Sequence, residues 1–113
     1  MANELVNTYT FNGDKNIVIQ DCGDFSGAKK ACIYLMWRNL NGTPIDTVVT
    51  FIKKISFDVN EWIEVPKLKL TIDTPNGQTE FIDELFTADI GGIKIVPNNC
   101  NSGTLAIYKR VEL

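Results

Sequence analysis

The chain has 113 residues, 44% of them hydrophobic and 22% charged, which is the balance of one globular domain, and we expect residues 1–113 to fold as a single unit. A net charge of -3 and scattered lysines argue against a nucleic-acid-binding groove, which needs basic side chains gathered against the phosphates. The longest uncharged apolar run, ACIYLMW, is far shorter than the ~20 residues of a membrane span, so no membrane contact is expected.

Apolar and polar residues alternate along much of the chain, which is the pattern of half-buried β-strands. Gly, Asn, Asp and Pro residues interrupt the pattern every ~8–12 residues, a spacing typical of a sandwich or barrel. The alternation predicts strands, in chain order, at residues 4–11, 17–20, 31–38, 46–57, 67–72, 93–96 and 105–111. We therefore predict an all-β fold, namely a single antiparallel β-sandwich, Ig-like or jelly-roll-like, with little helix.

Three segments carry further expectations. Residues 31–38 are apolar at both parities, so they are predicted to form a central strand covered on both faces, with Tyr34 and Met36 inside the sandwich. Residues 46–57 are predicted to continue as one strand. Its apolar face would carry Val49, Phe51, Ile55 and Phe57. Residues 79–86, TEFIDELF, fit either a twisted strand or one or two helical turns, and the sequence leaves this choice open.

The three cysteines form an odd set without a CxxC pair, which argues against a secreted disulfide framework. Cys32 lies in an apolar segment and is predicted to pack as a small apolar side chain. Cys22 and Cys100 both lie in turn-like, polar surroundings and could approach each other, so their pairing stays open. Reduced thiols are the expectation for a protein made in a cytosol.

The sequence contains no histidine, which removes the commonest general base and every Ser-His or Cys-His nucleophile pair. Carboxylates occur in near pairs, such as Asp21 with Asp24 and Glu61 with Glu64, but loops select Asp for its hydrogen bonds to the backbone. Calcium at Asp21 and Asp24 is a weaker alternative, because the spacing of an EF-hand is missing. We therefore predict no enzyme activity, no catalytic or metal-binding residue, and no cofactor.

The stretch SFDVNEW follows directly on an apolar segment and predicts a sharp corner in the chain. Ser56 and Asp58 would open it, with Asp58 accepting backbone N–H bonds in an Asx turn. Asn60 would take the left-handed conformation, which Asn tolerates better than most residues. Trp62 would then fold back and be mostly buried over apolar strand residues such as Phe57. The alternative is that Trp62 binds a ligand.

The spacing of Ser56, Asp58 and Trp62 resembles the hairpin corner of small β-sandwich proteins in tailed-phage virions. Upstream, YLMWRNLNGTPIDTVVTFIKKISFD is similar to the strand, Gly-Thr loop and strand of that family. Downstream, GGIKIVPNNCNSGTLAIYKR resembles its final hairpin. The resemblance covers roughly residues 25–65 and 91–110.

This resemblance implies a non-enzymatic structural component of a tailed-phage virion, such as a capsid decoration protein, a head-fibre base or a tail accessory protein. Such a protein would be made in the bacterial cytoplasm, reside in the virion, and bind capsid, portal or fibre proteins as part of a multimeric assembly. The alternative is a carbohydrate-binding or adhesion β-sandwich whose partner is a glycan. Its stacking platform would come from Trp37, Trp62, Tyr34, Tyr9 and Tyr108.

A β-sandwich has edge strands, which invite pairing with another chain. We expect the first and last strands to be two of these edges. The last strand carries Lys109 and Arg110, charges that guard an edge, whereas the first is mostly uncharged. The N-terminal segment is therefore the predicted contact with a partner protein. Its contact residues would be Leu5, Val6, Tyr9 and Phe11.

Overall fold

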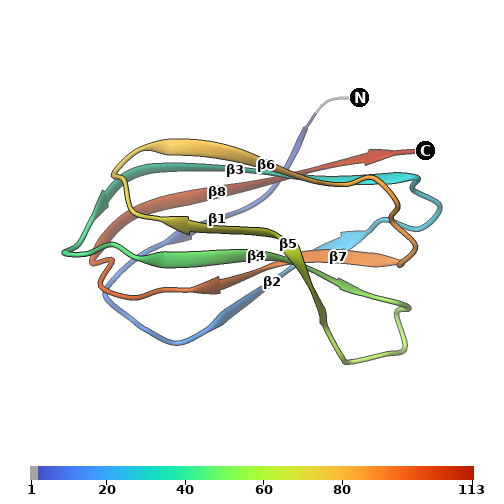
Figure 1. Cartoon of the computed structure of the whole chain (residues 1–113), viewed down its shortest axis with the longest axis horizontal. Helices are drawn as coiled ribbons and strands as arrows, with labels where there is room; N and C mark the ends of the chain where they lie inside the picture. The colour runs from blue at the N-terminus through green and yellow to red at the C-terminus, as the bar shows by residue number, and fades with distance from the viewer. Residues whose placement is uncertain (1–2) are drawn as a thin grey trace.

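The computed structural model describes residues 3–113 as two packed antiparallel sheets of four strands each (Figure 1). The first sheet contains, in spatial order, β1 (Glu4–Thr10), β8 (Ser102–Glu112), β3 (Lys30–Asn41) and β6 (Gly77–Asp83). The second contains, in spatial order, β2 (Val18–Asp24), β7 (Ile90–Val96), β4 (Thr47–Lys54) and β5 (Ile63–Ile72). No helix occurs in this described part of the chain, so none there could cross a membrane.

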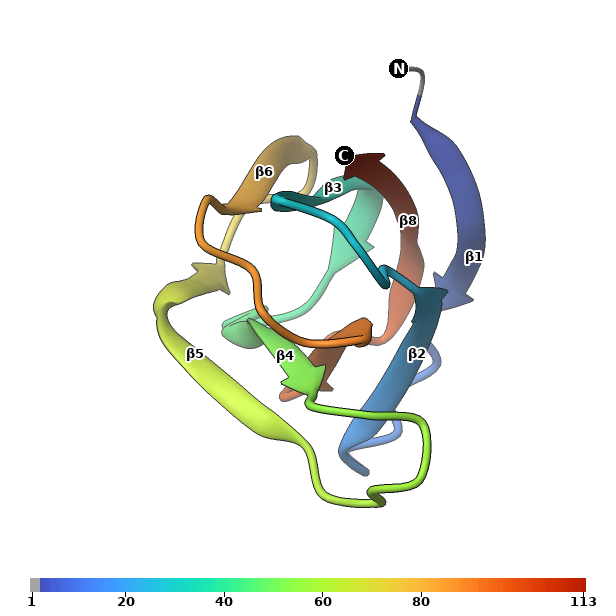
Figure 2. The same ribbon diagram turned by 90° about the vertical axis from the view of Figure 1, so that its right-hand side faces the viewer.

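The chain changes sheets at every connection except the one between β4 and β5. This order is that of the eight-stranded jelly roll. The prediction of a single antiparallel β-sandwich is thus confirmed, and the topology selects the jelly-roll type over the Ig type. Figure 2, which looks along the strands, shows the two sheets enclosing the interior of the molecule.

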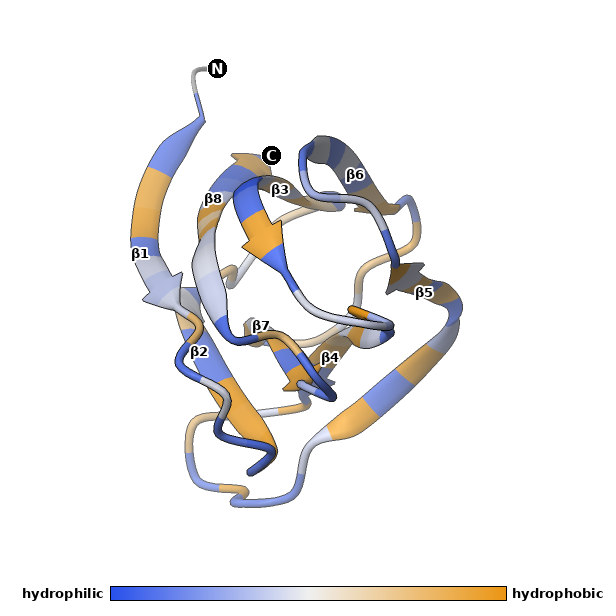
Figure 3. Ribbon diagram, turned by 90° about the vertical axis from the view of Figure 1, so that its left-hand side faces the viewer, coloured by the Kyte–Doolittle hydropathy of each residue, from blue (hydrophilic) through white to orange (hydrophobic). Residues whose placement is uncertain are grey.

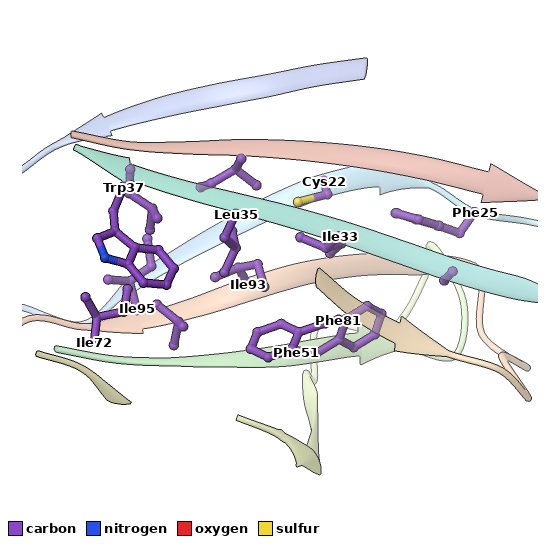
Figure 4. Packing of buried hydrophobic residues seen from close by; sticks show 14 of the residues in the cluster. Cys22, Phe25, Ile33, Leu35, Trp37, Phe51, Ile72, Phe81, Ile93 and Ile95 are labelled. Carbon is purple, nitrogen blue, oxygen red and sulfur yellow. The ribbon is translucent and has the colours of Figure 1, made fainter. Parts of the chain in front are cut away.

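The core lies between the sheets and is built from alternate residues of each strand. Ile33 and Leu35 of β3 are fully buried there, as are Phe51 of β4 and Ile93 and Ile95 of β7 (Figure 4). Because side chains of a strand alternate between its two faces, burial of one parity turns the other parity outward. Figure 3 shows the resulting alternation of hydropathy along β5.

Strand β3 lies between β8 and β6 and is therefore central, as residues 31–38 predicted. The expectation that Tyr34 and Met36 lie inside the sandwich is wrong. They have the opposite parity to the buried Leu35 and lie half-buried on the outer face, beside the side chains of β6 and β8. The apolar residues on the two faces of β3 therefore have different surroundings: one face is buried between the sheets, and the other is covered only in part.

Two predicted segments end earlier than expected. Residues 79–86 are strand through Asp83 and then turn, so they are not helical. Strand β4 stops at Lys54, and Ile55 and Phe57 are 62% and 57% exposed instead of continuing the buried face. In both cases the pairing ends before the apolar pattern does: β4 pairs with β7 only as far as Ile90, and β6 pairs with β3 only as far as Asp83.

The edge strands are β1 and β6 in one sheet and β2 and β5 in the other. The first strand is an edge, as predicted, and Figure 2 shows β1 on the outside of its sheet. The prediction for the last strand is wrong, since β8 lies between β1 and β3 and pairs with both. The charges of Lys109 and Arg110 therefore do not guard an edge; they contact neighbouring side chains and loops.

The predicted N-terminal contact residues divide between the surface and the core. Leu5 is 54% exposed, whereas Val6 and Tyr9 are half-buried against the core. Phe11 is 2% exposed and its ring meets that of Tyr9 edge-on, with the centroids 4.9 Å apart. Of the four, only Leu5 is presented as a surface contact, because the chain uses the others to close the sandwich.

The parity of β3 can be tested with neighbouring substitutions. Leu35→Ala should lower the free energy of unfolding by ~2–5 kcal/mol, since it opens a cavity between the sheets. Met36→Ala, one residue on but on the outer face, should cost about 1 kcal/mol or less. Urea denaturation of both variants measures the difference, and equal losses would contradict the assigned register.

Candidate functional site

The loop between β4 and β5 presents the most concentrated set of exposed apolar side chains on one segment. Ile55, Phe57 and Val59 are 62%, 57% and 38% exposed, and Ile63 at the start of β5 is 41% exposed. We call these four residues the apolar tip. Figure 1 shows the loop projecting from the body of the sandwich, below the plane of the strands in that view. Large apolar side chains gathered in this way on a projecting loop are a mark of an interaction site.

The turn within this loop differs in detail from the predicted corner. The backbone N–H of Val59 donates a hydrogen bond of 3.3 Å to the carbonyl oxygen of Ser56, which closes the turn. Asp58 and Asn60 are both exposed. The left-handed conformation predicted for Asn60 is wrong: within residues 3–113, the positive φ angles of non-glycine residues belong to Asn39 and Asp46.

Trp62 folds back onto the outer face of the second sheet, where it is half-buried. A Cβ atom added to Gly92 of β7 would lie 3.1 Å from Cη2 of the indole, so the ring rests directly on this glycine. The ammonium group of Lys54 lies 4.8 Å from the ring centroid, within the range of a cation–π contact. Trp62 therefore packs on the sheet at Gly92 and not on Phe57, and it is half-buried where the sequence predicted that it would be mostly buried.

The position of Trp62 also accounts for the burial of Ile52. This residue points to the outer face, because its neighbour Phe51 is in the core, yet it is only 1% exposed. Ile52 is the register partner of Gly92, the residue on which the indole rests. Trp62 thus anchors the base of the loop to the sheet and leaves the apolar tip in solvent.

Acidic residues are interspersed with those of the apolar tip along the chain. Asp58, Glu61 and Glu64 are all exposed, and Glu64 lies 3.6 Å from the ammonium group of Lys94. An apolar centre with a charged, solvated rim is the usual anatomy of a protein-binding patch. The negative sign of this rim favours a partner surface that carries basic residues.

A second patch lies on the outer face of the β1-β8-β3-β6 sheet. The rings of Tyr34 and Tyr108 lie side by side, with centroids 5.8 Å apart and planes 54° apart, and both residues are half-buried. The Tyr34 hydroxyl donates a hydrogen bond of 2.7 Å to Oε1 of Gln78. Leu5 is the register partner of Tyr108 and extends this patch towards the edge of the sheet.

Cys32 is buried, as predicted for a small apolar side chain, but it lies on this outer face and not in the cluster between the sheets. Its Sγ atom lies 3.3 Å from a carboxylate oxygen of Glu112 and 3.4 Å from Nη2 of Arg110. Arg110 in turn contacts Glu80 at 3.4 Å. Burial, and then the hydrogen bond to Glu112, raise the pKa of the Cys32 thiol. The thiol therefore stays protonated and serves packing and hydrogen bonding.

All three cysteines are free and buried, so the open question of a Cys22–Cys100 pair is answered by two separate thiols. Burial, followed by the negative charge of Asp21, raises the pKa of Cys22 to about 12. Burial likewise raises the pKa of Cys100. Because the thiolate is the reactive form of cysteine, none of the three is activated as a nucleophile.

The paired carboxylates of the sequence act within turns. Asp21 and Asp24 accept backbone hydrogen bonds of 2.7 Å from Gly23 and Ser26 respectively, so each closes a local turn. The hydrogen bonds from Ser26 lower the pKa of Asp24. Within residues 3–113, no group of three or more His, Cys, Asp or Glu side chains is placed to share a metal ion.

Comparison with known proteins shows similarity in fold only. No protein-family model and no curated protein sequence matches the chain. Among solved structures, it is similar to the crystal structure of the Yersinia pseudotuberculosis-derived mitogen (YPM), with a TM-score of 0.55 and 19% sequence identity over 98% of this chain and 88% of that one. At this level of identity, the likeness extends to the β-sandwich architecture.

The contact between Trp62 and Gly92 can be tested by adding one methyl group. Gly92→Ala would place a Cβ 2.6 Å from the carbonyl oxygen of Gln20 and 3.1 Å from the indole, so it should lower stability by ~1–3 kcal/mol and displace Trp62. A red shift in tryptophan emission would report the displacement. The control is Gly27→Ala, whose new Cβ meets nothing within 4 Å. The φ of +78° at this position strains an alanine and lowers stability too, but the indole is not touched, so the emission of the folded protein should stay unchanged. Unchanged emission in both variants would contradict the contact.

The raised pKa of Cys22 predicts a loss of stability in alkali. Below its ordinary pKa of 9.0 the thiol is protonated in both the folded and the unfolded chain, and its contribution is constant. Above that value the unfolded chain releases a proton that the folded chain retains, so stability falls as the pH rises from 9.0 to about 12. Urea midpoints across this range measure the effect. Cys22→Ala should flatten the dependence, and an equal slope in both proteins would refute it.

Proposed function

We propose that the protein is a non-enzymatic binding module that acts by protein–protein contact, as a structural component of a tailed-phage virion. The observation that carries this proposal is the apolar tip, where Ile55 and Phe57 are more than half exposed above an anchored loop base. An exposed apolar surface is costly in water unless a partner covers it. Full burial of such side chains contributes ~1.5–3 kcal/mol each, which is enough for two or three of them to form a hot spot.

The sequence resemblance supports the place of the protein in a virion. It implies a capsid decoration protein, a head-fibre base or a tail accessory protein that contacts capsid, portal or fibre proteins. The jelly-roll architecture is compatible with this proposal, since viral capsid domains use it, but lectin domains use it as well. Because one fold can serve several functions, the function has to be argued from the binding surface and not from the fold.

The local structure of the loop also supports a docking role. The Ser56–Val59 hydrogen bond and the seat of Trp62 on Gly92 order the loop before any partner arrives. A preordered loop loses less conformational entropy on binding than a flexible one, so more of the burial energy remains as affinity. The acidic rim formed by Asp58 and Glu61 would orient the partner and exclude water from the centre.

The second candidate is a carbohydrate-binding or adhesion module, and the paired rings of Tyr34 and Tyr108 are the observation in its favour. Sugars stack on exposed aromatic faces, whereas these rings are half-buried and inclined by 54° to each other, which offers no flat platform. The apolar tip is therefore the better-supported site. Binding on a glycan array that Tyr108→Ala abolishes would favour the second candidate instead.

The docking role predicts that polar substitutions at the tip prevent assembly. Particles produced with the Ile55→Ser/Phe57→Ser variant should carry at least ~10-fold less of the protein, because two partly desolvated anchors are lost. Quantitative mass spectrometry of purified particles measures the occupancy, and thermal unfolding verifies that the variant is folded.

The matched control is Ile17→Ser/Ile19→Ser. These isoleucines are 57% and 45% exposed, Ile17 just before β2 and Ile19 within it, so the chemical change is similar but lies outside the loop between β4 and β5. We expect wild-type occupancy from this control. Wild-type occupancy from the tip variant as well would place the contact elsewhere and refute the proposal.

A further inference from the structure

On one side of the sandwich, the edge strands β5 and β6 leave a local opening between them. A groove of about 460 Å³ runs there. Its lining consists of Val65, Lys67, Leu68, Ile82, Asp83, Glu84 and Leu85. The opposite side of the sandwich is bridged by a hydrogen bond of 2.8 Å from Asn7 of β1 to Gln20 of β2. We call the opening the edge groove, and Figure 2 shows the two strands that border it, β5 and β6, on the same side of the molecule.

The groove exists because β5 leaves the sheet in its middle. The register with β4 passes from Thr50–Lys69 directly to Ile52–Glu64, so residues 65–68 bulge away from their partner strand. Pro66 lies within this bulge, where its missing N–H is tolerated. The bulge leaves Val65 and Leu68 only half-buried, with their apolar surface facing the opening.

The other wall carries apolar side chains that protrude. Ile82 at the end of β6 is 36% exposed, and Leu85 in the following turn is 83% exposed. The groove therefore combines an apolar floor with a projecting leucine at its rim. Because both strands are sheet edges, backbone groups along the groove also lack strand neighbours on this side.

The two walls have opposite charge. Lys67 lies on the β5 wall, and Asp83 and Glu84 lie on the β6 wall. Asp83 is already paired with Lys53 at 3.3 Å. Lys67 and Glu84 are exposed, and neither forms an ion pair with another residue in the range 3–113. One basic and one acidic group thus stand on opposite sides of an apolar channel.

We propose that the edge groove is an interface between two copies of this chain. A two-fold axis parallel to the groove places the basic wall of each copy opposite the acidic wall of the other, so Lys67 faces Glu84 in two equivalent contacts. Leu85 of each copy then enters the apolar part of the other copy's groove. The surface is self-complementary in charge, which a two-fold contact requires and which distinguishes a second copy from an unrelated peptide.

The experiment is sedimentation velocity of the full chain from micromolar to millimolar concentration. We expect a reversible monomer–dimer equilibrium that weakens with added salt, because screening reduces the charge contacts. Leu85→Asp should raise the dimer dissociation constant by at least ~10-fold, since it brings two carboxylates into an apolar contact. Ile17→Asp, at a position 57% exposed outside the groove, is the matched control and should not change it.

A charge exchange makes the test specific to the proposed geometry. Lys67→Glu alone and Glu84→Lys alone each place like charges opposite each other and should weaken the dimer, whereas the double variant restores opposite pairs and should recover it. Thermal unfolding of each variant separates loss of fold from loss of pairing. A monomer at all concentrations, a dimer insensitive to Leu85→Asp, or a double variant no better than the single ones would each overturn the proposal. None of these outcomes depends on the partner of the apolar tip.

Discussion

The packing of β3 against β7 across the interior is the interaction on which the rest of the structure depends. Ile33 and Leu35 on one side and Ile93 and Ile95 on the other are fully excluded from water. Since the strand period is two, their burial fixes which residues of β7 face outward. A shift by one residue would turn the core of this strand to solvent, so the register is strongly specified.

The register of β7 also places the two glycines that precede Ile93, one on each face of the sheet. Gly91 faces inward, where an added Cβ would lie 2.9 Å from the ring of Phe25, and Gly92 faces outward beneath Trp62. Each glycine allows an aromatic ring to approach the backbone more closely than any other residue would. The position of the loop between β4 and β5 therefore depends on core packing of the neighbouring strand β7, through the contact of Trp62 with Gly92.

The sequence predicted the strands well, because their alternation is a local property. The alternation does not predict the order of the strands in each sheet, because that order depends on contacts between distant parts of the chain. Strand β8 lies between β1 and β3, and Tyr108 pairs with Tyr34, 74 positions earlier in the chain. The end of β4 was also predicted too late, at residue 57, because Ile55 and Phe57 continue the apolar alternation after the sheet ends. The pair Gly91–Gly92 carries a further signal in the sequence. Two consecutive glycines in a strand indicate a close approach by another group, and here that group is Trp62.

The two proposed surfaces are compatible in space, and their arrangement has a consequence for binding. The apolar tip lies at one end of the strands, and the edge groove runs along their side between β5 and β6. A two-fold axis parallel to the strands keeps both copies pointing the same way, so a dimer formed through the groove presents two tips at the same end. Two tips on one rigid body convert the second contact with a particle into an intramolecular event, which raises the apparent affinity by about 10²–10⁴-fold without any new contact. A repeated surface, on which equivalent sites recur at fixed spacing, would profit from such a dimer, whereas a single site would gain nothing from it. Pairing through the groove would therefore select for partners that are themselves symmetric.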